Sequence, residues 1–184
     1  YRGKKKIQMS TRSGTFIPMS ELYNEVGIDA ARFFYISKSQ SQHLDFDLEL
    51  AKQTNNENPV YYIQYAHARI CRVLNQTTKQ NMPFEKEVAE INLEKLITKH
   101  EVELIAKLSG YPALIQQSAN NRTVHTLANY LNELAQLFHS YYGAETFLIL
   151  DKELRNARLL LIQAVKIILK NGLSIIGVSA PTKM

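Results

Sequence analysis

Cysteine, glycine and proline are all scarce in this sequence. It has one cysteine, Cys71, with 7 glycines and 5 prolines among 184 residues. A single cysteine excludes a disulfide scaffold within the chain and argues against a zinc site built from thiolates. The 45% of hydrophobic residues argue against disorder and suit one domain with a hydrophobic core. We interpret Cys71 as a small packed side chain rather than a nucleophile.

Long apolar runs are missing as well. The apolar stretch 159–169 is interrupted by Gln163 and Lys166, so we expect no membrane-spanning helix. The first residues are basic but lead into no apolar segment, and the sequence therefore predicts no signal peptide. We expect a cytoplasmic location. Because the chain starts at Tyr1, we also interpret it as a fragment of a longer protein.

Acidic residues are absent before Glu21. Residues 13–184 carry 17 basic and 17 acidic side chains, so the net charge of +5 lies in a short N-terminal arm. Such an arm is typical of a mobile segment that meets phosphate, although a solvated tail is an equally good interpretation. We expect residues 1–18 to be loosely held. The basic residues of the arm are Arg2, Lys4, Lys5, Lys6 and Arg12.

Catalytic signatures are also missing from the sequence. It contains no P-loop, no dinucleotide-binding glycine pattern, no H-E-x-x-H and no G-x-S-x-G. Asp45 and Asp47 are two residues apart, and we interpret them as capping or solvated charges rather than an acid/base pair. We therefore predict no metal site and no enzyme that is complete in itself.

Helical punctuation is frequent in the first half of the chain. Ser20 is a plausible N-cap for a helix that Gly27 ends, and Asp29 is expected to cap the next helix. Asn58 followed by Pro59 is a clear start signal. We expect the helix that starts there to run to about residue 74, followed by a polar loop over residues 76–83.

Apolar stripes with helical spacing continue in the second half. They lie at residues 102–108, at 127–138 before Gly143, and at 154–168, where Gly172 is the expected helix stop. No region shows the sustained alternation of a β-sheet. The sequence therefore predicts an all-α fold, an antiparallel helix bundle.

The helix after Pro59 has two distinct faces. Its apolar residues share one face, and we interpret His67 beside them as a hydrogen-bonded core histidine. Tyrosine and arginine interleaved on one face suit RNA, because rings stack on unpaired bases and guanidinium groups pair with phosphates. The pattern alone leaves open that the tyrosines pack on a neighbouring helix while the arginines meet acids. The polar face carries Tyr61, Tyr65, Arg69 and Arg72, with Gln64 at its border.

Several segments resemble a known family. Gln-Met-Ser-Thr-Arg-Ser-Gly-Thr-Phe at residues 8–16 resembles the KMSKS-type loop of a class I aminoacyl-tRNA synthetase. Asn-Pro-Val-Tyr-Tyr-Ile-Gln-Tyr-Ala-His-Ala-Arg at residues 58–69 is similar to arginyl-tRNA synthetases. Further similar segments, which extend the resemblance over essentially the whole chain, lie at residues 25–27, 29–33, 43–47, 127–131, 138–142 and 157–184.

The resemblance implies three parts. Residues 1–20 are expected to be the end of the catalytic domain with a flexible basic loop, residues 21–43 the connecting helices, and residues 44–184 the helical DALR anticodon-binding domain. The parent enzyme would use ATP and Mg²⁺ to attach arginine to tRNA(Arg). Its Rossmann half would precede Tyr1, so we expect this chain alone to be inactive and monomeric, with the catalytic domain and tRNA(Arg) as partners.

The same resemblance implies site residues. In the family, the second lysine of the signature loop stabilises charge on pyrophosphate, but Thr11 stands at that position. Arg12 or an upstream lysine such as Lys6 is the candidate replacement. Tyr142 and Met184 match residues near the anticodon loop, and Gln64, Tyr65 and Arg69 flank that surface.

Two alternatives remain open at this point. The chain is either an RNA-binding module of a ligase or a protein-interaction bundle with an incidental basic arm. Likewise, the ring of Tyr142 either faces solvent at a helix end, where it stacks on an anticodon base, or is buried and closes the bundle.

Overall fold

The computed structural model describes residues 18–184, which fold into nine α-helices and one 3₁₀ helix with no strand among them. The all-α prediction is confirmed. Within this range no helix is long and apolar enough to cross a membrane. The elements are α1 (Met19–Val26), α2 (Ile28–Ile36), α3 (Leu48–Lys52), α4 (Pro59–Lys79), α5 (Lys86–Glu90), η1 (Leu93–Lys95), α6 (Lys99–Ser109), α7 (Tyr111–Asn121), α8 (Val124–Ala144) and α9 (Lys152–Ile175).

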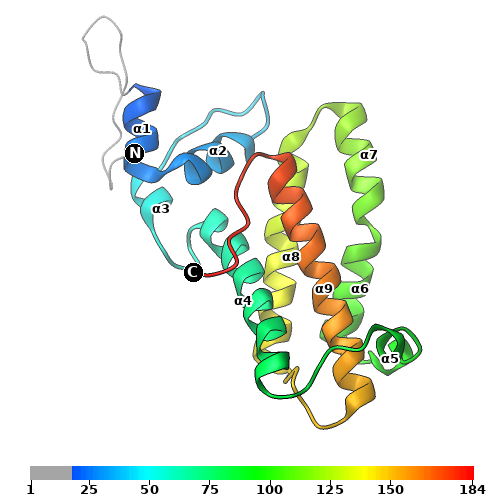
Figure 1. The fold of residues 1–184 in the computed structure, drawn as a ribbon. Coiled ribbons are helices and arrows are strands. Elements are labelled where there is room, and N and C mark those ends of the chain that lie inside the picture. The colour runs from blue at the N-terminus through cyan, green and yellow to red at the C-terminus, as the bar shows by residue number, and fades with distance from the viewer. Residues whose placement is uncertain (1–17) are drawn as a thin grey trace, which may run out of the picture.

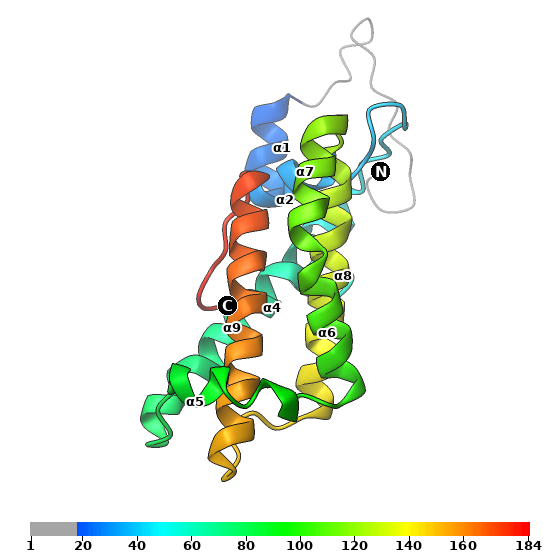
Figure 2. The same cartoon turned by 90° about the vertical axis from the view of Figure 1, so that its right-hand side faces the viewer.

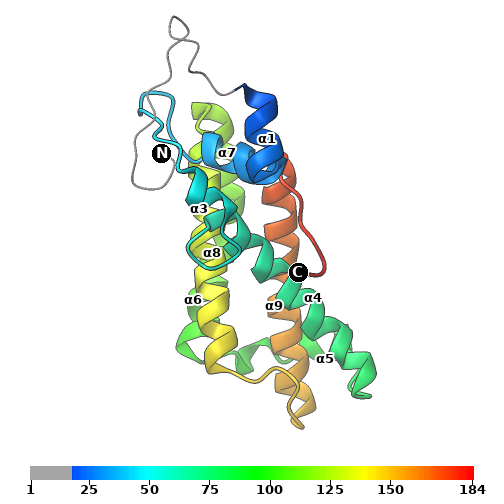
Figure 3. The same ribbon diagram turned by 90° about the vertical axis from the view of Figure 1, so that its left-hand side faces the viewer.

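The long helices form the body of the molecule. Helices α4, α8 and α9 contact one another, and α6 and α7 follow each other along the outer side of α8 (Figures 1 and 2). The short helices α1, α2 and α3 lie together at one end, beside the start of α4 (Figure 3). The core is filled by side chains that are fully buried, among them Ile63, Ile70, Leu104, Leu131, Leu134, Phe138, Leu159, Ile162 and Leu169.

Side-chain caps begin several of these helices as their residue types predict. Asn58 Oδ1 accepts a hydrogen bond from the Val60 amide at 3.2 Å, with Pro59 in the first turn. Asp47 caps α3 by accepting from two backbone amides. Thr98 and Glu101 form a capping box at the start of α6, which satisfies two amides that have no partner within the helix.

Several helix boundaries differ from the sequence prediction, and α8 also continues through Gly143, the expected end, to Ala144. Helix α1 starts from Pro18 rather than from a Ser20 cap. Asp29 lies in the first turn of α2 and does not cap it, because its carboxylate accepts hydrogen bonds from residues distant in the sequence. Helix α4 continues to Lys79, so it includes the first half of the loop that was expected over residues 76–83, and Thr77 in this part is buried. The polar residues there form the solvent side of a helix, and they resembled a loop by composition alone.

Gly172 is not a helix stop. It lies inside α9, where an added Cβ would be 2.5 Å from Leu131 Cδ2. The glycine therefore allows α8 and α9 to approach closely. Helix α9 ends at Ile175, and Gly177 then adopts a φ of 70° that favours glycine.

A buried ion pair joins three helices of the bundle. Glu101 Oε1 accepts hydrogen bonds from Tyr141 Oη at 3.0 Å and from Arg158 Nε at 2.9 Å, and the Glu101 side chain is fully buried. Burial alone raises the pKa of the Glu101 carboxyl, but hydrogen bonds from Thr98 and Tyr141 and the charge of Arg158 outweigh it and lower that pKa. Arg158 also pairs with Glu145 at 2.7 Å.

Candidate nucleic-acid interface

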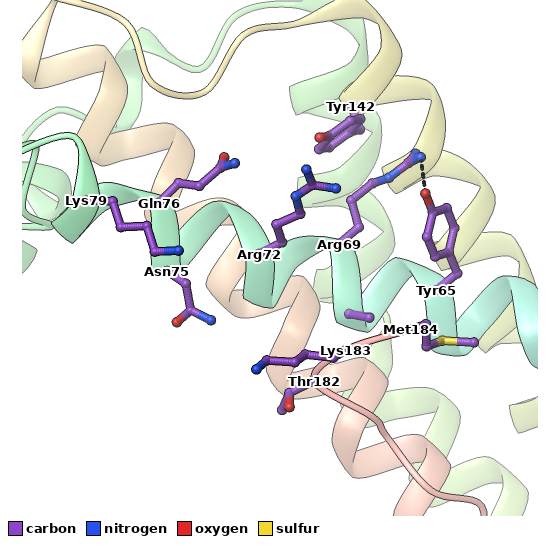
Figure 4. A pocket seen from close by; sticks show the side chains of 11 residues that line it. Tyr65, Arg69, Arg72, Asn75, Gln76, Lys79, Tyr142, Thr182, Lys183 and Met184 are labelled. Atoms are coloured by element: carbon purple, nitrogen blue, oxygen red, sulfur yellow. Dashed lines mark hydrogen bonds between the residues drawn. The ribbon is translucent and has the colours of Figure 1, made fainter.

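A cleft of about 500 Å³ lies between α4, the end of α8 and the segment that follows α9 (Figure 4). Helix α4 supplies most of its wall, from residues spaced three and four apart, so that they share one face. Residues 182–184 close the opposite side. The lining residues are Tyr65, Ala68, Arg69, Arg72, Asn75, Gln76, Lys79, Tyr142, Thr182, Lys183 and Met184.

The cleft is strongly cationic. Arg69, Arg72, Lys79 and Lys183 all line it, and none of the described lining residues is acidic. Four positive side chains in a concave surface concentrate the field there, which attracts polyanions such as a nucleic-acid backbone. Asn75 and Gln76 add amide donors and acceptors of the kind that hydrogen-bond base edges.

Arg69 is held between two aromatic rings. Its guanidinium carbon lies 4.5 Å from the centroid of the Tyr65 ring and 4.3 Å from that of Tyr142. Its Nη2 also donates a hydrogen bond to Tyr65 Oη at 2.9 Å, drawn as the dashed line in Figure 4. The sequence left open that the arginines of this face meet acids. Arg69 instead contacts the two rings, the Tyr65 hydroxyl and His139.

That histidine, His139, fixes the arginine from the side. Its Nε2 donates to the Tyr62 carbonyl oxygen at 3.1 Å, so its Nδ1 is the nitrogen that accepts from Arg69 Nη1 at 3.2 Å. Burial lowers the pKa of His139; the bond to Tyr62 raises it, and the charge of Arg69 lowers it further. A neutral imidazole therefore orients the guanidinium without competing charge.

Tyr142 is half-buried rather than fully exposed or fully closed off. Its ring centroid lies 6.0 Å from that of Phe138 and 5.8 Å from that of Phe147, while Arg69 covers part of its face. Its neighbour Tyr141 is the tyrosine that closes the bundle, with no exposed surface. The ring of Tyr142 therefore lines the cleft while Phe138 and Phe147 anchor it from the inside.

A second cleft of about 390 Å³ lies on the other side of the Tyr65 and Arg69 pair. The rings of Tyr61 and Tyr65 stack there with centroids 6.1 Å apart and planes 16° apart. Polar residues 54–56 and His139 complete it. The tyrosine and arginine face predicted from the sequence thus separates two adjoining clefts.

The other sequence-predicted residues have different placements. Met184 lines the first cleft and is 51% exposed. Gln64 does not line it, because its side-chain amide is hydrogen-bonded to Asp29 and Ser179. His67 is buried and hydrogen-bonded, and Cys71 is buried, as both were interpreted. The expected signature-loop residues Lys6, Thr11 and Arg12 lie outside the described residues. So does the segment that was expected to be loosely held, residues 1–18, except for Pro18.

Sequence reasoning missed part of the cleft. Asn75, Gln76 and Lys79 continue the α4 face at helical spacing, but the helix was expected to end at about residue 74, so these residues were not assigned to it. Lys183 enters the cleft through the path of the segment after α9, for which the sequence offers no periodic signal. Among the residues that the structure describes, no group of three His, Cys, Asp or Glu side chains is placed to hold a metal.

An all-helical bundle with an aromatic and cationic cleft suits a helical domain that binds nucleic acid. The family described as the DALR anticodon binding domain matches residues 63–184. The chain therefore belongs to this family, and the resemblance seen in the sequence is confirmed.

Two relatives that match the whole chain are both named arginine–tRNA ligase. The chain is 57% identical over 184 residues to an arginine–tRNA ligase of Coxiella burnetii (strain CbuK_Q154) and 50% identical to one of Legionella pneumophila (strain Corby). All of this chain is matched in both cases, yet it spans only 31% of each relative's length.

Solved structures share this fold. One from Campylobacter jejuni, whose description names an arginyl-tRNA synthetase, superposes with a TM-score of 0.84 at 28% identity and covers all of this chain and 38% of its own. The Thermus thermophilus arginyl-tRNA synthetase superposes with a TM-score of 0.74 at 26% identity, covering 95% of this chain and 29% of its own.

Proposed function

We propose that this chain binds the anticodon loop of tRNA(Arg) as the anticodon-binding part of an arginine–tRNA ligase. The observation that carries the proposal is Arg69, fixed between the rings of Tyr65 and Tyr142 in a cleft with three further cationic side chains. Membership of the DALR family and the names of the relatives support the same assignment.

In this proposal the cleft holds an unpaired anticodon base. The base stacks on the aromatic surface of Tyr142, and the thioether of Met184 packs against it as a soft, adaptable side chain. Arg72, Lys79 and Lys183 meet the neighbouring phosphates. Arg69 is already oriented before RNA arrives, which reduces the entropy lost on binding.

The ligase reaction belongs, in the same proposal, to the part of the enzyme that these 184 residues do not span. ATP and Mg²⁺ would act there, with Lys6, Thr11 and Arg12 on the adjoining signature-like loop. Among the described residues no group of three His, Cys, Asp or Glu side chains is placed to hold Mg²⁺, and we derive no chemical step through ATP or Mg²⁺. We place the enzyme in the cytoplasm and expect the 184-residue chain, a monomer, to show no arginine-dependent exchange of pyrophosphate into ATP.

Competition binding tests the proposal. The purified chain is titrated into labelled tRNA(Arg) with excess bulk tRNA from which tRNA(Arg) has been removed, at several salt concentrations. We expect affinity to fall with salt, because phosphate contacts release counterions, while the preference for tRNA(Arg) persists. Equal displacement by every tRNA, or no binding at all, would favour the protein-interaction bundle instead.

A further inference from the structure

The segment after α9 folds back along the bundle. It leaves the end of α9, turns at Gly177 and runs beside α4 (Figures 1 and 3). Ile176 and Val178 on either side of the turn are each only 4% exposed. The turn packs tightly, since a Cβ on Gly177 would lie 2.2 Å from Arg32 Nη1. The segment is therefore anchored at its start by buried apolar side chains.

A hydrogen-bonded cluster anchors the segment further along. The Ser179 amide donates to Asp29 Oδ1 at 3.2 Å, and Ser179 Oγ donates to Asp29 Oδ2. Gln64 Nε2 approaches Asp29 Oδ2 at 2.8 Å and the Ser179 carbonyl oxygen at 3.0 Å. One side chain of α2 and one of α4 thus hold the same residue of the returning segment.

His67 provides the next attachment point. Its Nδ1 lies 2.8 Å from the Pro181 carbonyl oxygen, which can only accept, so Nδ1 is the protonated nitrogen. The ring is 1% exposed. A buried donor in a fixed orientation leaves Pro181 little freedom, because releasing it would strand the imidazole N–H without a partner.

These attachments end where the cleft begins. Thr182, Lys183 and Met184, which directly follow Pro181, form the cleft wall opposite α4 (Figure 4). We propose that Asp29, Gln64 and His67 are positioning residues that hold this wall in place for RNA, and so make the shape of the cleft depend on helix α2. The inference rests on the proposed function.

Gln64 has a competing interpretation, as a direct RNA contact of the kind that the sequence predicted. A double-mutant cycle separates the two. Gln64→Ala is combined with a wall variant in which Lys183→Ala and Met184→Ala remove the side chains that the positioning serves. If Gln64 acts through the wall, its replacement has no further effect once those side chains are gone. A direct contact is lost equally in both backgrounds.

The expected results are specific. Gln64→Ala weakens binding of a tRNA(Arg) transcript by about 3- to 10-fold, because residues 182–184 must then be ordered when RNA binds, and the entropy lost in ordering them lowers the affinity. It leaves affinity unchanged in the wall variant. Asp29→Ala provides a second route: removing a negative charge strengthens RNA binding by electrostatics alone, whereas positioning predicts weaker binding. Stronger or unchanged binding by Asp29→Ala would overturn the inference.

A measurement without RNA keeps this inference separate from the proposed function. Amide hydrogen exchange of residues 178–184 reports whether the wall is held. We expect at least about tenfold faster exchange in Gln64→Ala and Asp29→Ala than in the control Gln117→Ala, an exposed glutamine on α7. Unchanged exchange refutes the positioning role. If exchange accelerates but the unaltered chain ignores tRNA(Arg), the proposed function fails while the attachment itself stands.

Discussion

Replacement of Tyr142 by alanine separates RNA binding from folding. The half-buried ring lies against Phe138 and Phe147 inside and against Arg69 at the cleft. Stacking of one base on an aromatic ring contributes roughly 1–3 kcal/mol to the binding free energy, so we expect the variant to bind tRNA(Arg) about 5- to 150-fold more weakly. Full burial of an aromatic ring is worth about 3–5 kcal/mol on truncation, and partial burial sets the expected loss of stability near 2 kcal/mol.

Tyr141 is the matched control, one residue away on the same helix. Its ring is fully buried and its hydroxyl donates to Glu101 Oε1 at 3.0 Å. Tyr141→Ala therefore costs more than about 3 kcal/mol, because a cavity forms and the buried carboxylate loses a donor. The two variants should thus rank in opposite order for stability and for the affinity of the folded fraction.

Urea unfolding followed by circular dichroism gives the stabilities, and fluorescence anisotropy with labelled tRNA(Arg) gives the affinities. Tyr142→Phe keeps the ring on Arg69 and should bind almost normally. The reasoning is refuted if Tyr142→Ala binds tRNA(Arg) as tightly as the unaltered chain, or if it unfolds the domain as readily as Tyr141→Ala does.

Three further predictions concern stability. Glu101→Gln breaks the buried pair with Arg158 and should lower the free energy of unfolding, measured in urea, by about 3–5 kcal/mol. Because folding lowers the pKa of the Glu101 carboxyl, the unaltered chain should also lose stability as the pH falls below 4.5, the ordinary pKa of this group, and the variant should lose less. Gly172→Ala should destabilise by about 1–3 kcal/mol through its clash with Leu131. Combined with Leu131→Ala, which is itself destabilising because Leu131 is fully buried, it should cost less than in the unaltered chain, since the clashing side chain is gone. Burial lowers the pKa of the His67 imidazole below its ordinary value of 6.5, so at pH values near and below 6.5 the unfolded chain binds a proton more readily than the folded chain does. The urea concentration at the unfolding midpoint should therefore decrease when the pH is lowered from 7 to 5.5, and it should decrease less in His67→Asn. A midpoint that does not change with pH would contradict this.

Local signals made much of the fold predictable. Asn58 with Pro59 and Asp47 act through their own side chains on the nearest amides, so their helix starts followed from residue type. The apolar stripes of α8 and α9 became the core because burial follows periodicity. Gly172 misled the prediction because its reason lies in another helix: no local pattern reveals that Leu131 occupies the space of its absent side chain.

The site followed the same rule. Tyr65 and Arg69 share a face of one helix at a spacing of four, so their proximity was predictable. Their partner Tyr142 lies on α8 and was predicted only through the resemblance of residues 138–142 to a family, whereas the contact of Arg69 with His139 was not predicted. The attachment of Gln64 to Asp29 and Ser179 spans up to 115 residues of sequence and has no signal in any one segment. Contacts between residues so far apart in the sequence can be identified only once the fold is known.

The anticodon itself provides the most direct test of the proposed function. Dissociation constants are measured for a tRNA(Arg) transcript and for the same transcript with its anticodon bases replaced, using the full chain at one salt concentration. We predict that the replacement weakens binding by about tenfold or more, as expected when one stacked and hydrogen-bonded base is lost, and that Tyr142→Ala binds both transcripts with similar, weakened affinity. Equal affinity of the unaltered chain for the two transcripts would contradict an anticodon-binding cleft.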